Sequence, residues 1–423
     1  MSQLPQELLD IVVDHLHDDP HSLKSCALAA RAFLISARIH IFRRIEILPP
    51  KPKTTPSPSP CQNLLALLTS SPHLPPLVEE LCVVSRGSSS NESSGPDKTS
   101  ILEGPRSWIM TDDSLSLILP LLNLKRISLI ENTPSWGTSV RWNDVPYPLY
   151  TALTATFRSP RLKAIHLRGM IVDSPAQLLS LFRDAASLTE LSLSRVRFTK
   201  IPPHTTSLWP DLDARPWRPR LRTLLVSDLR SGPLCEYLSA PGIDLGGVKV
   251  LTVATFRPQS RNIITQAASG VKHLRLLYHP SPLSTGLPSS IFSIATLCSI
   301  HIFGTWHWPF GVIYSFFSAF LAPSHLEAVV FEGLAEQDGG NNIGLRGSLS
   351  ELDAAVDAAI GRHFHLLGTV GIQRTLYLNS DRFRSFEEWS TTVQETLPSL
   401  AARGILRLTE NRVPNNGVQH GFE

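Results

Sequence analysis

A short apolar motif recurs along most of this chain. It consists of an apolar residue, two residues of any kind, a second apolar residue, one residue of any kind and a third apolar residue. The second apolar positions are Leu81, Ile127, Ile165, Leu191, Leu224, Leu251, Leu274, Ile300 and Val329, with weaker copies near Leu376 and Leu406. Because side chains alternate between the two faces of a strand, each copy predicts a short strand with one buried face.

One such unit cannot bury its own apolar face, so the units must stack side by side. The intervening segments supply helices or loops. We predict a helix between Asp173 and Ala185 with Pro175 near its start, and capping boxes at Ser348 with Glu351 and at Ser385 with Glu388. The predicted fold class is α/β, with parallel strands lining one face and helices and loops on the other. A doubly wound sheet, the alternative, would require longer β-branched strands and a Gly-rich phosphate turn, which the sequence lacks.

The first 48 residues predict three short helices that carry apolar residues on nearly every side. Asp19 is the expected N-cap of the second helix, with Pro20 following it. A segment of this size cannot bury so much apolar surface by itself. It therefore packs either against another polypeptide or against the first repeat of its own chain.

The rest of the domain organisation follows from composition. Prolines concentrated in residues 49–60 predict a semi-rigid linker. Residues 61–410 form the repeat domain. The Ser-rich stretch at 85–100 has almost nothing to bury and is expected to be a disordered insert. Residues 411–423 remain as a tail.

The N-terminal segment resembles an F-box. The resemblance is carried by Leu-Pro-Gln-Glu-Leu-Leu at 4–9, Asp18-Asp19, Ser22-Leu23, Cys26-Ala27-Leu28, Arg31 and Phe33-Leu34. The repeats resemble an irregular leucine-rich-repeat solenoid. The combination, with a proline-rich link between the two parts, is similar to a large fungal group of F-box-like proteins.

This resemblance implies a function. F-boxes bind the Skp-type adaptor of cullin–RING (SCF-type) ubiquitin ligases, so the chain would be a substrate receptor in ubiquitin-dependent protein degradation and not an enzyme. By family position, the adaptor-binding residues would be Leu4, Pro5, Leu8, Leu23, Ala27, Leu28 and Phe33. The alternative is a leucine-rich-repeat interaction scaffold without a ligase role, whose N-terminal helices only cap the repeats.

Target binding would use strand residues that point away from the core. These are His166, Arg168, Ser192, Thr252, Arg275, His301 and Tyr377. Four arginines also surround Trp217, at positions 215, 218, 220 and 222. They form either a basic surface loop or a site for an acidic or phosphorylated target, since guanidinium groups suit both anions.

The sequence offers no set of residues for catalysis or for binding a cofactor. It has no G-x-S-x-G nucleophile turn, which argues against a hydrolase, and no HExxH or closely spaced cysteine pair for a metal. Five dispersed cysteines and the absence of an apolar leader favour a reducing intracellular compartment, cytoplasmic or nuclear. The apolar run at 308–323 is too short for a membrane span and predicts a buried helix. A net charge of +3 gives no argument for nucleic acid.

Overall fold

The computed structural model describes residues 5–50, 58–85, 107–131, 140–199, 220–227, 232–239, 243–254, 258–278, 291, 294–304, 317, 325–334, 353–354, 357–377 and 385–413. The chain divides into two compact units, residues 1–188 with 196–200 and residues 189–195 with 201–423. The Ser-rich insert beyond Ser85, the capping box at Ser348 and Glu351, and the apolar run at 308–323 apart from Phe317 lie outside the described residues.

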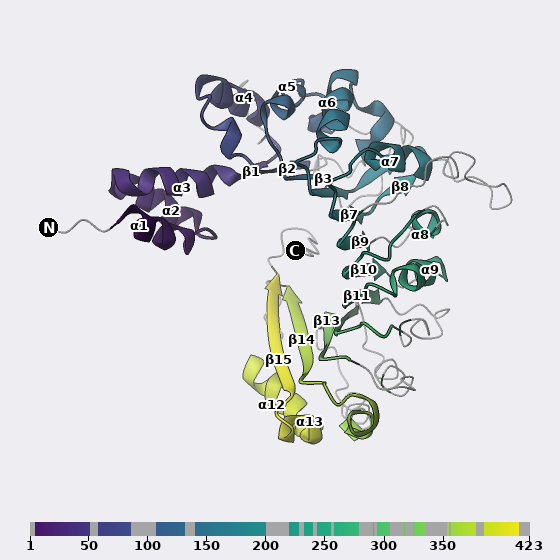
Figure 1. Ribbon diagram of the computed structural model, residues 1–423. Coiled ribbons are helices and arrows are strands. Elements are labelled where there is room, and N and C mark those ends of the chain that lie inside the picture. Colours follow the sequence, from purple (N-terminus) through teal and green to yellow (C-terminus); the bar gives the residue numbers. More distant parts are fainter. Residues whose placement is uncertain are drawn as a thin grey trace, which may run out of the picture. The chain divides into compact units, whose positions relative to one another are not determined.

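The N-terminal segment forms three helices, α1 (Gln6–Asp14), α2 (Pro20–Ala29) and α3 (Arg31–Arg43). Asp19 caps α2 as predicted, because its carboxylate accepts the backbone N–H groups of His21 at 3.0 Å and Ser22 at 3.2 Å. Pro20 occupies the first helical position, where a missing N–H costs nothing. Figure 1 shows the three helices as a bundle that leads directly into strand β1.

Four strands of the first unit pair in parallel and in sequence order. The motif positions Leu81, Ile127 and Ile165 stand in register, and all three are buried. Figure 1 shows helices above these strands. The strands are β1 (Arg44–Ile47), β2 (Glu80–Ser85), β3 (Arg126–Glu131) and β5 (Ala164–Arg168).

Strand β1 corrects the expected boundary of the helical segment at residue 48. The helices end at Arg43, and the next four residues are extended and pair with β2. The physical reason is the period-two pattern of Ile45 and Ile47, which places Ile47 in the core. Helix α4 likewise begins at Pro60, at the end of the expected linker, with a capping box between Ser59 and Gln62.

Helices and a second small sheet complete the first unit. Gly169, at φ +74°, makes the turn between β5 and β6. A Cβ there would lie 2.7 Å from the backbone oxygen of Glu131, so only glycine fits.

The small parallel sheet is β4 (Val140–Arg141), β6 (Met170–Val172) and β8 (Arg197–Phe198). The helices are α4 (Pro60–Ser70), α5 (Ser114–Ile118), α6 (Tyr147–Phe157) and α7 (Pro175–Phe182). Helix α7 confirms the predicted helix with Pro175 at its start.

Eight strands of the second unit also pair in parallel and in sequence order. Their apolar motif residues form one continuous row, Leu191, Leu224, Leu251, Leu274, Ile300 and Val329, and every one is buried. The strands are β7 (Glu190–Ser194), β9 (Thr223–Ser227), β10 (Val250–Ala254), β11 (His273–Tyr278), β12 (Ser299–Gly304), β13 (Ala328–Leu334), β14 (Thr369–Tyr377) and β15 (Leu406–Val413).

The row continues into β14 at Val370 and not at Leu376, where the sequence placed the weak copy of the motif. Val370 is the register partner of Val329 and of Leu406, whereas Leu376 pairs with Arg412. The cause is the length of the last two strands. Strand β14 begins seven residues before Leu376, so the row enters it near its first residue. The sequence carries a full copy of the motif at this place, with its apolar positions at Leu367, Val370 and Ile372.

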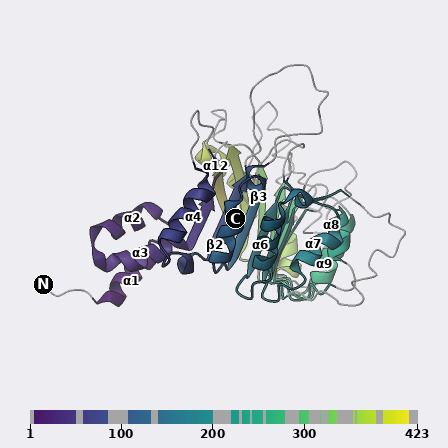
Figure 2. The same cartoon turned by 90° about the horizontal axis from the view of Figure 1, so that it is seen from above.

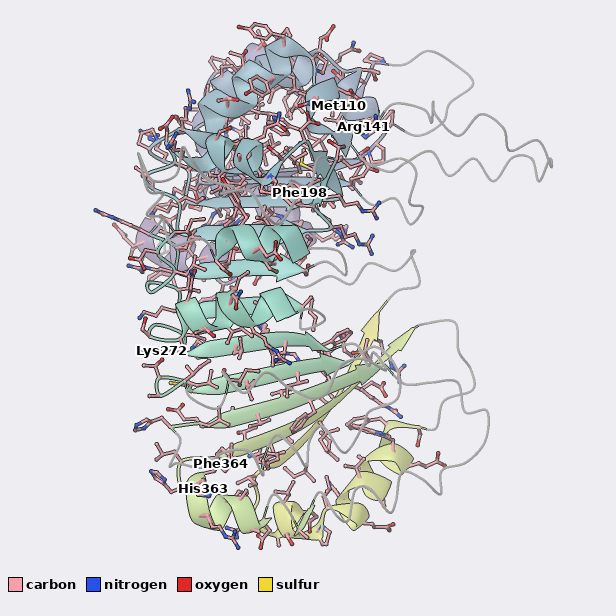
Figure 3. All side chains as sticks on the ribbon, turned by 90° about the vertical axis from the view of Figure 1, so that its right-hand side faces the viewer. Met110, Arg141, Phe198, Lys272, His363 and Phe364 are labelled. Atoms are coloured by element: carbon pink, nitrogen blue, oxygen red, sulfur yellow. The ribbon has the colours of Figure 1, made fainter. Side chains whose placement is uncertain are left out.

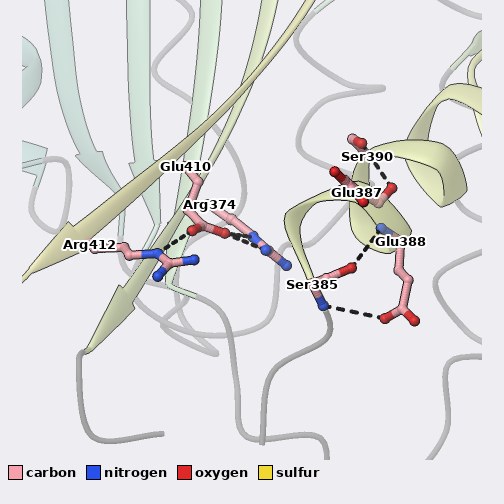
Figure 4. Close-up of polar contacts among 7 residues, drawn as sticks. All are labelled: Arg374, Ser385, Glu387, Glu388, Ser390, Glu410 and Arg412. Atoms are coloured by element: carbon pink, nitrogen blue, oxygen red, sulfur yellow. Dashed lines mark hydrogen bonds and ion pairs between the residues drawn. The ribbon is translucent and has the colours of Figure 1, made fainter. Parts of the chain in front are cut away.

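Helices of the second unit lie on one face of its strands. Figures 1 and 3 show α8 (Gly232–Leu238) and α9 (Pro258–Ala267) on the same face of β9–β11, and Figure 2 gives the view from above. Near the C-terminus lie α12 (Phe386–Thr396) and α13 (Pro398–Ala402). Ser385 and Glu388 form the predicted capping box of α12 (Figure 4).

A buried ion pair joins the last two strands, and its arginine also packs against α12. The Arg374 guanidinium in β14 bonds to the Glu410 carboxylate in β15, and both side chains are almost fully buried (Figure 4). The same guanidinium lies 4.9 Å from the ring centre of Trp389 and 5.7 Å from that of Phe386. Cation–π attraction therefore adds to the ion pair at this place.

Candidate protein-binding surfaces

The N-terminal helices expose an unusual amount of apolar side chain. Of thirteen large apolar residues that are exposed in the described part of the chain, six lie on α1–α3. Leu8 is 48% exposed, Ile35 72% and Leu28 89%; the other three are Ile11, Val12 and Ile39. Because exposed apolar groups of this kind gather at interaction sites, these helices form the first candidate surface.

Polar contacts at a constant interval join α1 to α3. The Gln6 amide donates to the backbone oxygen of Ala32 at 2.9 Å, and the Ser36 hydroxyl donates to the Asp10 carboxylate. The His40 imidazole lies 2.7 Å from the Asp14 carboxylate. Each pair is 26 residues apart, and the pairs advance by four residues along both helices. The two helices therefore run side by side in the same direction.

This alignment places three isoleucines on one side of the helix pair. Each residue turns a right-handed helix by about 100°. The contact positions of the two parallel helices face each other. One side of the pair is therefore formed by residues that follow a contact position on α1 and by residues that precede a contact position on α3. Ile11 follows Asp10, while Ile35 and Ile39 precede Ser36 and His40. We call Ile11, Ile35 and Ile39 the isoleucine face.

The opposite side of the pair is covered by α2. Val13 and Ala37 lie there and form a fully buried core with Leu23 of α2. Leu16, Ala27, Phe33 and Ile41 pack against this core. The three helices thus bury one side of the α1–α3 pair by themselves and leave the isoleucine face exposed.

The residues that the F-box resemblance implied fall into three groups. Pro5, Leu8 and Leu28 are exposed, as a contact surface requires. Leu23 is 1% exposed, which corrects the expectation that it contacts a partner, because the other two helices already cover it. Ala27 and Phe33 are half-buried against the same core, and Leu4 lies outside the described residues.

Four exposed apolar residues were missed by sequence reasoning, namely Ile11, Val12, Ile35 and Ile39. The signal was present, since Leu8, Ile11 and Val12 have the spacing of one helix face, as do Ile35 and Ile39. Each of these helices also carries a second apolar stripe, so the exposed stripe could not be identified from spacing alone. Sequence alone does not tell which of two stripes is covered by α2.

The strand residues expected to bind a target differ in exposure. Thr252, Arg275 and His301 are adjacent in register on β10, β11 and β12. Arg275 is exposed, and His166, Arg168, Ser192 and His301 are half-buried. Thr252 is 4% exposed, which corrects its assignment as a contact residue. The side chain of Tyr377 is not among those that the structure describes.

A buried carboxylate stands beside this row. The Glu332 carboxylate lies 3.0 Å from the His301 imidazole and accepts the Thr375 hydroxyl at 2.6 Å. Burial alone would raise the pKa of Glu332, but the bonds from His301 and Thr375 and the charge of Arg275 outweigh it, so this pKa lies below its ordinary value. Sequence reasoning missed Glu332, because a single acid in an apolar strand gives no distinctive pattern.

The described residues contain no group of three or more His, Cys, Asp or Glu side chains that could hold a metal ion. Within the same residues, no helix has both the length and the apolar character needed to cross a membrane. Cys61 is fully buried, and burial raises the pKa of its thiol to about 12, with the nearby Asp112 adding to the effect. This thiol is therefore not an activated nucleophile.

Comparison with protein-family models gave no match, and comparison with curated proteins gave none either.

Proposed function

We propose that this chain is a substrate-receptor subunit of an SCF-type cullin–RING ubiquitin ligase. Helices α1–α3 would be the F-box-like part and would bind the Skp-type adaptor. The repeat strands would bind the protein to be modified. The observation that supports this function is the isoleucine face, an apolar surface on a helix pair whose other side is already packed.

We also propose that the strand region is a leucine-rich-repeat-like solenoid. Within each unit, successive strands pair in sequence order, and the motif residues occupy the same register position. In the second unit, helices lie on one face of the strands. These are features of repeats that bury their apolar faces only by stacking.

The mechanism in this proposal is positioning. An adaptor bound at one place and a target bound at another would be held together by a single chain. Such tethering raises the effective concentration of target lysines near the ubiquitin carrier. Complete burial of an exposed isoleucine contributes about 1.5–3 kcal/mol. Three of them would therefore contribute several kcal/mol to the gross binding free energy of a helix-on-helix interface.

Co-purification with a Skp-type adaptor tests this proposal. We expect the wild-type chain to retain the adaptor and the variant Ile35→Asp with Ile39→Asp to lose it. Leu67→Asp is the matched control, since Leu67 is an equally apolar exposed residue on α4 of the same unit. Adaptor binding that survives the double change, or that the control also abolishes, would contradict the proposal.

A second function is favoured by one observation. Helix α3 continues into β1, and the Arg43 guanidinium bonds to the Glu79 carboxylate at 3.0 Å just before β2. The helices would then serve as a cap of an interaction scaffold. Deletion of residues 1–43, which keeps β1, separates the two functions. A scaffold cap predicts unfolding of the remaining chain, whereas a docking segment predicts that it stays folded.

A further inference from the structure

Three basic residues of the second unit stand in one line at the starts of neighbouring strands. The backbone N–H of Lys249 donates to the oxygen of Arg222 at 2.8 Å, and that of Lys272 donates to the oxygen of Lys249 at 2.9 Å. All three side chains are exposed, and Figure 3 places Lys272 at the start of β11. We call Arg222, Lys249 and Lys272 the basic column. Arg220, which is also exposed, lies two residues before Arg222 in the sequence.

The equivalent line in the first unit begins with alternating charge at Arg43, Glu79 and Lys125 and ends in a second lysine, because the backbone N–H of Lys163 donates to the oxygen of Lys125. There the backbone N–H of Glu79 donates to the oxygen of Arg43, and that of Lys125 donates to the oxygen of Glu79. The Glu79 carboxylate bonds to both basic side chains, and its pKa is lowered, mainly by the bond from Lys125. Arg43 and Lys125 therefore share one counter-charge, the Glu79 carboxylate.

Among the residues that the structure describes, no carboxylate lies within ion-pair distance of Arg222, Lys249 or Lys272. Like charges directly opposite each other on neighbouring strands destabilise a sheet, and neighbouring strands are only about 4.8 Å apart. A partner that supplies negative charge at this edge would relieve the repulsion.

We propose that the basic column binds an extended acidic segment of a protein partner. The column is about 10 Å long across its three strands, and carboxylates on alternate residues of an extended peptide are about 7 Å apart, so two of them lie within reach of the three long side chains. Two observations favour a short acidic segment over nucleic acid. The line continues through Cys298 to Glu327, which would repel a longer polyanion, and the net charge of the whole chain is only +3. The proposal does not depend on the ligase role, because it needs only this edge.

Fluorescence anisotropy with the full chain and a short fluorescein-labelled, glutamate-rich peptide tests the proposal. We expect binding that weakens as salt is added, and a further loss of about tenfold in Lys249→Glu with Lys272→Glu, because each reversal replaces an attraction by a repulsion. The matched control is Arg261→Glu with Arg362→Glu, which changes net charge equally at exposed positions of the same unit.

Three results would overturn the proposal. They are no binding by the wild-type chain, equal weakening by the two double variants, and tighter binding of single-stranded DNA that the column variant abolishes. The last result would assign the edge to nucleic acid. Because the altered side chains are exposed, unchanged thermal unfolding of both variants checks that the comparison reports binding.

Discussion

Replacing Leu23 by alanine tests whether α1–α3 possess a core of their own. The Leu23 side chain is fully buried among Val13, Ala37 and the residues packed around them. The change removes three carbons at about 0.8 kcal/mol each and leaves a cavity, so we expect a loss of about 3 kcal/mol. The unfolding free energy of a bundle of three short helices is small, so this loss should cause α1–α3 to open locally.

Hydrogen exchange followed by mass spectrometry measures this opening in peptides from residues 5–43. We expect Leu23→Ala to speed exchange about a hundredfold there, since each 1.4 kcal/mol is a factor of ten. Ile35→Asp is the comparison, because a side chain that is 72% exposed should change stability by less than about 0.5 kcal/mol. Unchanged exchange in Leu23→Ala, or equally fast exchange in Ile35→Asp, would refute this division into covered and open faces.

Three further predictions concern stability elsewhere in the chain. Glu332→Gln should cost about 1 kcal/mol at pH 7 by urea unfolding. Because the folded-state pKa of Glu332 is lowered, its contribution is present above the ordinary pKa of 4.5 and is lost as pH falls through the folded value, so wild type and variant should converge in acid; a gap that persists would contradict the assignment. Glu410→Ala should cost about 3 kcal/mol, because it leaves the buried Arg374 guanidinium without its carboxylate, whereas Ser385→Ala should cost about 1 kcal/mol through loss of a helix cap; equal losses would argue against the ion pair. Gly169→Ala should cost more than about 2 kcal/mol, since its φ is positive and the new Cβ meets a backbone oxygen; a neutral effect in thermal unfolding would contradict this.

The sequence was sufficient for the repeated strands because their signal is local and recurs. Each copy of the motif places apolar residues two positions apart, and the nine strong copies from Leu81 to Val329 all lie on parallel strands. Helix starts were also predictable from short-range chemistry, as at the caps Asp19 and Ser385 and at Pro175 in the first turn of α7. The copy near Leu376 was misplaced because the full motif at Leu367, Val370 and Ile372, where the register runs, was overlooked.

The surfaces were harder to predict because they depend on which side of an element is covered. Both stripes of α1 and α3 are apolar, and only the position of α2 determines that Val13 and Ala37 are inside and Ile35 outside. The same difficulty affected Thr252, which alternates correctly for an outward residue but is buried. The basic column could not be seen in sequence, since its members lie more than twenty residues apart.

The affinity of the purified full chain for a Skp-type adaptor tests the central claim most directly. Isothermal titration should detect binding by the wild-type chain, a loss of at least about tenfold in Ile11→Asp with Ile35→Asp, and no change in Lys24→Glu, an exposed polar position on α2. Binding that is absent from the wild type, or that does not depend on the isoleucine face, would contradict the proposed docking of this chain to a ligase.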